Sequence, residues 1–158
     1  MKFRLIQAYM ATARIFAELS YAKRLHVGAI VVKEDRIISI GYNGMPAGWD
    51  NNCEDEINEF IVTSPDGPPF KESTVEVKKI LKTKPEVLHA ESNAVSKLAR
   101  SSESGDGSTM FVTHAPCLDC AKLIYQSGIK KLFYGEEYRS SDGILFLQKC
   151  NIQVEQVK

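Results

Sequence analysis

The sequence is poor in several features that would indicate a particular class of protein. Its 158 residues contain no apolar run approaching the roughly 20 residues of a membrane span. Residues 1–19 mix Gln, Arg and Glu with the apolar residues, so no secretion signal is expected. Neither sign of charge is in excess, because 20 basic residues balance 20 acidic ones, and nothing favours a polyanionic partner. We therefore expect a cytoplasmic protein that binds neither membrane nor nucleic acid.

Cysteine is scarce, with only Cys53, Cys117, Cys120 and Cys150 in the chain. Without a secretion signal, a disulfide framework is the weaker interpretation. The close pair Cys117 and Cys120 is typical of either a metal site or a redox pair. We interpret Cys53 and Cys150 as ordinary thiols, although either could supply a fourth ligand to a structural zinc ion.

Helical and strand patterns alternate along most of the chain, which predicts one α/β domain over residues 1–158. Apolar residues at helical spacing predict an opening helix over 3–19. Strands at 29–32 and 36–40 form a predicted hairpin with a turn at 34–35. Further helices are expected at 87–100, 116–128 and 144–150, and further strands at 109–113, 129–135 and 152–157.

The stretch from about 54 to 85 fits this pattern least well. We interpret 53–62 as a short helix, 63–70 as a loop with three prolines, and 73–82 as another helix that ends before Pro85. The stretch is too short to bury a core of its own, so we expect an excursion from the domain.

Two predicted helix starts carry the residues with chemistry. His89-Ala90-Glu91 begins one, and Pro116-Cys117-Leu118-Asp119-Cys120 begins the other. Two cysteines three positions apart on a helix reach the same ion, and a helix N-terminus favours their thiolate form. His89 would complete three protein ligands and leave the fourth position of a Zn²⁺ ion to water, as in catalytic zinc sites.

Glu91 follows His89 by two residues and can face the same site without binding the metal. A carboxylate there can accept a proton from the water and pass it on. The pair of motifs H-x-E and P-C-x-x-C is the signature of zinc-dependent nucleobase deaminases. A redox pair or a structural zinc site remains the alternative interpretation of the cysteines alone.

With these motifs in place, the chain resembles the cytidine deaminase-like superfamily and its deoxycytidylate (dCMP) deaminase branch. The resemblance rests on four segments: VGAIVV (27–32), GYNGMPAG (41–48), HAESNAV (89–95) and VTHAPCLDCAKLIYQSGIKKLFY (112–134). It implies a three-layer α/β/α fold with a mixed five-stranded sheet. It also implies hydrolytic, zinc-dependent deamination of dCMP to dUMP and ammonia, which supplies dTMP synthesis.

The resemblance also suggests substrate contacts. Asn43 would bind the sugar or base, the backbone N–H of Ala90 would bind the base carbonyl, and Thr113 and Tyr138 would be walls of the site. We add Lys23 and Arg24 as phosphate contacts, because a phosphate needs cationic or N–H partners and this basic pair precedes the first strand. A solvated basic loop is the alternative.

Assembly and regulation are expected only from the resemblance. It suggests a homohexamer that is activated by dCTP, with Mg²⁺ bound to that effector, and inhibited by dTTP. Some relatives carry a second, structural zinc, but segment 20–26 here has no Cys and segment 54–85 has no His. We therefore expect one zinc ion per chain.

Two other functions remain possible from the sequence. One is a tRNA adenosine deaminase, against which the balanced charge argues. The other is a non-catalytic, zinc-stabilised nucleotide-sensing module, against which Glu91 argues, since a structural site needs no proton carrier.

Overall fold

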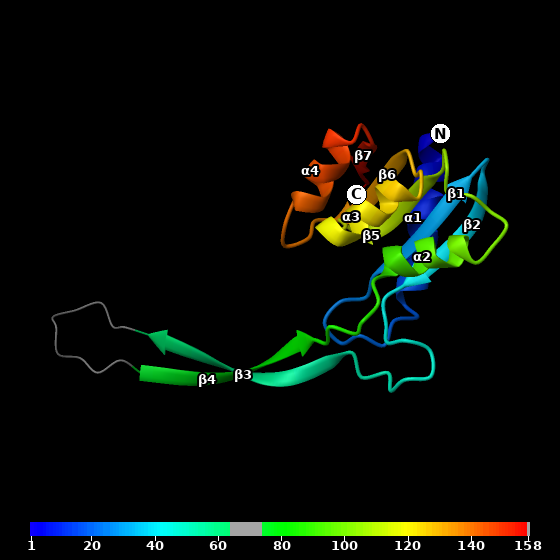
Figure 1. The fold of residues 1–158 in the computed structure, drawn as a ribbon. Helices are drawn as coiled ribbons and strands as arrows, with labels where there is room; N and C mark the ends of the chain where they lie inside the picture. Colours follow the sequence, from blue (N-terminus) through cyan, green and yellow to red (C-terminus); the bar gives the residue numbers. More distant parts are fainter. Residues whose placement is uncertain (64–73, 158) are drawn as a thin grey trace.

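The computed structural model describes residues 1–63 and 74–157 (Figure 1). The elements, in chain order, are α1 (Phe3–Ala17), β1 (Gly28–Lys33), β2 (Arg36–Tyr42), β3 (Glu54–Thr63), β4 (Thr74–Thr83), α2 (Ala90–Ala99), β5 (Thr109–His114), α3 (Leu118–Gln126), β6 (Lys131–Glu136), α4 (Asp142–Lys149) and β7 (Gln153–Gln156). No helix in these ranges combines the length and apolar composition needed to cross a membrane.

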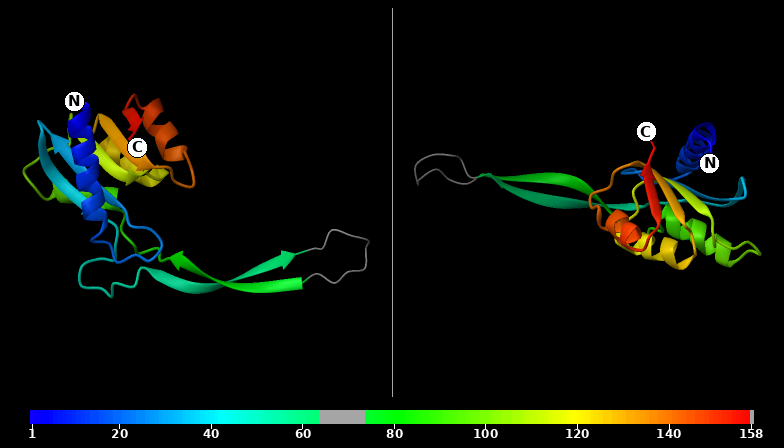
Figure 2. Two further views of the ribbon diagram at one scale, coloured as in Figure 1. Left: turned by 180° about the vertical axis from the view of Figure 1, so that it is seen from behind. Right: turned by 90° about the horizontal axis from the view of Figure 1, so that it is seen from above.

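A mixed sheet of five strands forms the centre of the molecule, in the order β2-β1-β5-β6-β7. Strand β1 is antiparallel to β2 and β5, whereas β5, β6 and β7 run parallel. Helix α1 covers one face, and α2, α3 and α4 cover the other (Figure 2, right). The predicted three-layer α/β/α fold is therefore confirmed.

Alternation along the central strands supplies both layers of the core. Ile30 and Phe111 face α1, whereas Val31, Met110 and the residues that alternate with them face α2, α3 and α4. Under α1, the rings of Phe111 and Phe133 stack with centroids 4.9 Å apart, and Tyr9 lies 5.3 Å from Phe111. Burying each such ring stabilises the fold by about 1.5–3 kcal/mol, so the sheet and α1 are held by a dense aromatic contact.

The two helices predicted at 53–62 and 73–82 are wrong, because both segments are strands. β3 and β4 pair antiparallel over ten residues each, from Glu54 opposite Thr83 to Thr63 opposite Thr74. Both segments are rich in β-branched and aromatic residues, which favour strands. The loop predicted at 63–70 lies almost wholly outside the described residues.

We call β3 and β4 the arm, and the rest of the described chain the body. The arm extends away from the body as a two-stranded ribbon (Figures 1 and 2). Elsewhere the expected helices and strands are present, with ends that differ by a few residues. Where we expected an excursion with two helices, the described residues form a two-stranded ribbon.

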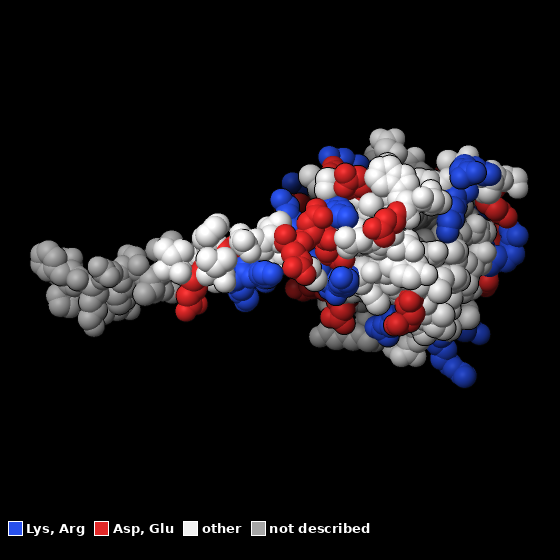
Figure 3. Space-filling model, turned by 90° about the horizontal axis from the view of Figure 1, so that it is seen from below, with Lys and Arg blue, Asp and Glu red and all other residues white. Residues whose placement is uncertain are grey.

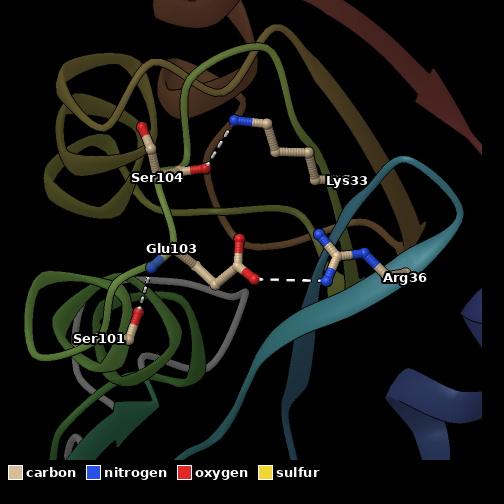
Figure 4. A network of polar contacts seen from close by, with 5 residues as sticks. All are labelled: Lys33, Arg36, Ser101, Glu103 and Ser104. Carbon is tan, nitrogen blue, oxygen red and sulfur yellow. Dashed lines mark hydrogen bonds and ion pairs between the residues drawn. The ribbon is translucent and has the colours of Figure 1, made fainter.

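Exposed polar contacts tie the connection after α2 to the turn between β1 and β2 (Figure 4). Lys33 Nζ donates to the carbonyl of Ser104 over 3.2 Å, and Arg36 Nη1 lies 3.5 Å from Glu103 Oε1. The N–H of Glu103 donates to Ser101 Oγ over 3.1 Å. Exposed pairs of this kind contribute little stability, but they mark the end of the sheet where β5 begins.

The face of the molecule seen in Figure 3 carries Lys and Arg side chains among Asp and Glu side chains. On that face neither sign forms a continuous field. Arguments about charged ligands therefore depend on the residues of a particular site.

Candidate active site

A cavity of about 480 Å³ opens at the opposite end of the sheet, where β5 and β6 end and β1 begins. Ligands of α/β proteins commonly bind outside the carboxyl ends of parallel strands. His89, Ala90 and Glu91 reach the cavity from the start of α2, and Cys117 reaches it from the start of α3. The two predicted helix starts are thus brought to one site.

His89, Cys117 and Cys120 place their ligand atoms within 4.8 Å of one another. His89 Nδ1 lies 3.7 Å from Cys117 Sγ and 3.4 Å from Cys120 Sγ. Tetrahedral zinc with bonds of about 2.3 Å to sulfur and about 2.05 Å to nitrogen separates such donors by about 3.6 Å. The donor set and its spacing therefore fit a zinc ion.

The two sulfurs differ in protonation. Hydrogen bonds from Cys120 and His89 lower the pKa of Cys117 to about 4. The neighbouring Cys117 sulfur and burial raise the pKa of Cys120, and the hydrogen bond to Cys117 raises the pKa of His89. One thiolate is thus already present at neutral pH, and a metal would displace the remaining protons on binding.

Glu91 is the second residue of α2, lines the cavity and is only 4% exposed. Burial raises its pKa to about 7. A carboxyl group with a pKa near neutrality holds and releases a proton readily, which suits general acid–base catalysis.

Two glycines let the site-bearing helices pack closely. A Cβ on Gly41 of β2 would lie 2.0 Å from the carbonyl oxygen of Ala90, and a Cβ on Gly143 of α4 would lie 2.1 Å from that of Pro116. Any larger residue would push away the start of α2 or the segment before α3. The positions of the candidate ligands therefore depend on these two close approaches.

The substrate contacts expected from the family resemblance do not all line the cavity. Ala90 and Tyr138 line the cavity, and so does Asn43. The amide of Asn43 also holds the adjacent backbone, because its Oδ1 accepts from the N–H of Val27 (2.8 Å) and its Nδ2 donates to the carbonyl of Leu25 (2.9 Å).

Thr113 is not among the described residues that line the cavity. Its hydroxyl accepts from the N–H of Gly28 (3.1 Å) and lies 3.1 Å from His114 Nδ1, and it is His114 that lines the cavity. Thr113 therefore joins β5 to β1 directly behind the wall.

Of the two basic residues predicted to bind the phosphate, one lines the cavity and the other does not. Arg24 lines the cavity, and its Nη1 donates to Thr83 Oγ1 over 2.9 Å, whereas Lys23 is absent from the described lining. Sequence reasoning missed Arg139, which lines the cavity with its guanidinium 5.5 Å from the Tyr138 ring. Its position shortly after β6, a parallel strand, could have indicated a residue of the ligand site. Glu54 was also missed, because its segment was interpreted as a helix.

The comparisons with known proteins agree with this geometry. Residues 4–136 match the family model described as the cytidine and deoxycytidylate deaminase zinc-binding region. The chain belongs to this deaminase family. It is an enzyme, a hydrolase that acts on a carbon–nitrogen bond of a cyclic amidine.

Several members of the family are similar over most of the chain. Deoxycytidylate deaminase of Enterobacteria phage T4 is 40% identical over 130 residues, which cover 71% of this chain and 67% of that protein. ComE operon protein 2 of Bacillus subtilis is 33% identical over 157 residues, which cover 96% and 70%.

Among solved structures, the dCMP deaminase from the cyanophage S-TIM5 in complex with dCMP and dUMP is 44% identical, with a TM-score of 0.80 over 99% of both chains. A tRNA:A34 deaminase structure has a TM-score of 0.58 at 18% identity. At that identity the likeness to the tRNA deaminase shows the fold alone.

Proposed function

We propose that this deaminase hydrolyses dCMP to dUMP and ammonia. The supporting observation is the 44% identity, over 99% of both chains, to a dCMP deaminase solved with dCMP and dUMP. The cluster of His89, Cys117 and Cys120 beside the buried Glu91 supplies the chemistry that this reaction needs.

His89, Cys117 and Cys120 would hold one zinc ion, which when bound supplies Lewis-acid activation of the hydrolytic water. Glu91 carries the proton. It accepts a proton from that water and delivers it to the ring nitrogen N3. It then takes the second proton, from the hydroxyl now on C4, and transfers it to the amine, which leaves as ammonia while the C4 carbonyl forms. Its pKa near 7 lets it do both in one cycle.

The remaining cavity residues would orient the nucleotide. The N–H of Ala90 precedes the helical hydrogen-bond ladder and is available for the base carbonyl. We assign Tyr138 as a stacking wall and Asn43 as a sugar or base contact. Thr113, which was expected in the wall, would support it from behind through its contacts with Gly28 and His114. Arg24 and Arg139 line the cavity and would bind the phosphate. Lys23 is the third basic residue that we assign to the phosphate.

Assembly and control remain predictions from the family resemblance. They comprise a homohexamer in the cytoplasm, activation by dCTP with Mg²⁺, inhibition by dTTP, and a role in supplying dTMP synthesis. Steady-state rates with and without each effector, together with sedimentation of the protein, test them.

The substrate assignment is tested with the zinc-loaded protein and a panel of dCMP, cytidine, guanine and a tRNA anticodon stem. We expect ammonia and dUMP from dCMP, and one zinc ion per chain by metal analysis. Turnover of cytidine, guanine or the tRNA stem without turnover of dCMP would replace this substrate with the one consumed. Zinc binding without any turnover would favour the nucleotide-sensing module.

The phosphate contacts are tested with Arg24→Ala and Lys23→Ala as separate variants. Loss of a phosphate partner raises KM for dCMP more than it lowers kcat. The lining of the cavity favours a large rise for Arg24→Ala and a small one for Lys23→Ala. An unchanged KM in either variant would show that the substituted residue does not bind the phosphate and belongs to a solvated basic loop.

A further inference from the structure

Glu54, the first residue of the arm, has a buried carboxylate that the mechanism above does not use. It lines the cavity and is 4% exposed. Its Oε1 accepts two backbone hydrogen bonds, from the N–H of Lys23 (3.0 Å) and the N–H of Arg24 (3.2 Å). Its Oε2 is buried and has no hydrogen-bond partner among the described residues.

A buried carboxylate oxygen without a partner is costly, because burial removes the hydrogen bonds it made with water. The neighbouring polar side chains make their hydrogen bonds to groups other than Oε2. The Arg24 guanidinium donates to Thr83, His26 Nε2 lies 2.7 Å from the carbonyl of Ala22, and the Asn43 amide holds Leu25 and Val27. Oε2 is therefore a preorganised acceptor on the wall of a ligand cavity.

The chemistry of the substrate limits what can donate to this oxygen. A cytosine 2′-deoxynucleoside monophosphate has two kinds of donor, the exocyclic amine and the sugar 3′-hydroxyl. Its base carbonyl and ring nitrogen accept hydrogen bonds, and its phosphate is repelled by a carboxylate. The amine is the group removed, so it must lie with Glu91 and the metal ligands. The 3′-hydroxyl is the donor that remains.

We propose that Glu54 is a specificity-determining residue that accepts a hydrogen bond from the 3′-hydroxyl of the substrate sugar. This assignment rests on the proposed function and makes it more specific. The N–H groups of Lys23 and Arg24 hold the carboxylate in place through Oε1. Oε2 then favours a substrate whose 3′ position carries a hydrogen-bond donor. The base of the arm is thereby part of the substrate site, since Thr83 at the end of β4 lines the same cavity.

The test compares dCMP with its 3′-fluoro analogue, in which fluorine replaces the hydroxyl and no donor is left. We expect the wild-type protein to prefer dCMP by about 10⁴-fold in kcat/KM, as sites built to bind a substrate hydroxyl do. Glu54→Gln keeps an oxygen for Lys23 and Arg24 and presents an NH₂ donor instead. That variant should lower the preference at least tenfold. Glu56→Gln, on the same strand but exposed, is the matched control and should leave the preference unchanged.

The outcomes separate this inference from the proposed function. Turnover of dCMP with equal preference in wild type and Glu54→Gln would overturn the role of Glu54 and leave the function intact. If Glu54→Gln does not fold, the wild type alone decides, because equal rates on dCMP and the fluoro analogue would overturn the proposal. If dCMP is not deaminated, the function fails, and calorimetry with dUMP and 3′-fluoro-dUMP decides. Equal affinities, or no binding of either, would then overturn the role of Glu54.

Discussion

Phe111 in β5 and Phe60 in β3 are the same residue type in the same type of element, yet their exposures are 0% and 66%. β5 has strands on both sides and helices on both faces, so Phe111 meets Tyr9 and Phe133. β3 pairs with β4, and within residues 1–63 and 74–157 no helix or further sheet covers either face of this ribbon (Figure 1). A two-stranded ribbon cannot bury its own side chains. Apolar composition therefore produces a strand in both regions, but a core only where layers stack.

The candidate functional residues are also distributed unequally between the body and the arm. The candidate zinc ligands and Glu91 belong to the body, where packed helix starts hold them. Among its described residues, the arm contributes Glu54 and Thr83 at its base to the cavity, while most of the other described residues of β3 and β4 are exposed. The contrast predicts large effects for changes in the body and small ones for changes along the arm.

The largest expected effect is on turnover, from Glu91→Gln. The amide cannot accept or deliver the proton, so kcat should fall by about 10²–10⁴-fold, the usual contribution of such a group. Zinc content and the unfolding midpoint should stay close to wild type. Glu56→Gln on the arm is the control and should keep full activity; an equal loss there would show that the arm takes part in the chemistry.

Next comes a pair of truncations that compares the two phenylalanines directly. Phe111→Ala should lower the free energy of unfolding by about 3–5 kcal/mol, because it leaves a cavity between α1 and the sheet. Phe60→Ala should change it by less than about 0.5 kcal/mol. Urea unfolding of both variants measures this. A cost above about 1 kcal/mol for Phe60→Ala would mean that another surface covers the arm in solution.

A smaller effect is expected from the glycines. Gly41→Ala forces β2 away from the start of α2 and should cost about 1–3 kcal/mol, as overpacking does. Zinc affinity should fall with it, since His89 immediately precedes the first residue of the same helix. Gly44→Ala is the matched control, because a Cβ there meets nothing within 4 Å. Thermal unfolding and a zinc titration compare them, and similar behaviour of the two variants would contradict the close approach.

The smallest effect is expected from shortening the arm. Asp55 and Lys82 are opposite each other, so residues 56–81 can be replaced by Asn-Gly, which closes a two-residue hairpin. The free energy of unfolding should change by less than about 1 kcal/mol, and turnover should persist because Glu54 and Thr83 remain. Loss of cooperative unfolding would show that the arm and body are one folding unit.

Sequence reasoning worked where local pattern and local chemistry agree. The helical periodicity of 3–19 and the short apolar run at 29–32 each indicate one element, and the body follows them. The spacing of Cys117 and Cys120, taken together with the H-x-E motif at His89, favours a metal site without reference to the fold. The same reasoning gave the wrong structure for the arm. The β4 sequence, TVEVKKILKT, is compatible with an exposed helix almost as well as with a strand, and only its pairing with β3 decides between them.

Arg139 and Glu54 are cavity residues that sequence motifs could not have revealed. Neither belongs to a motif, and both matter because chain segments far apart in sequence meet at one cavity. Lys23 and Arg24 are neighbours with the same charge, yet the path of the backbone points only one of them at the site. Which side chain lines a cavity is a property of the fold.

The sequence by itself determined the candidate metal-ligand types, the position of Glu91 two residues after His89, and the short apolar segments that build the sheet, because these depend on the residues of one element. Tertiary structure alone decided that two helix starts meet within 4.8 Å, that the 54–83 segment projects as a ribbon, and that a carboxylate from its base lies buried beside the same cavity. These depend on contacts between segments that no local spacing specifies.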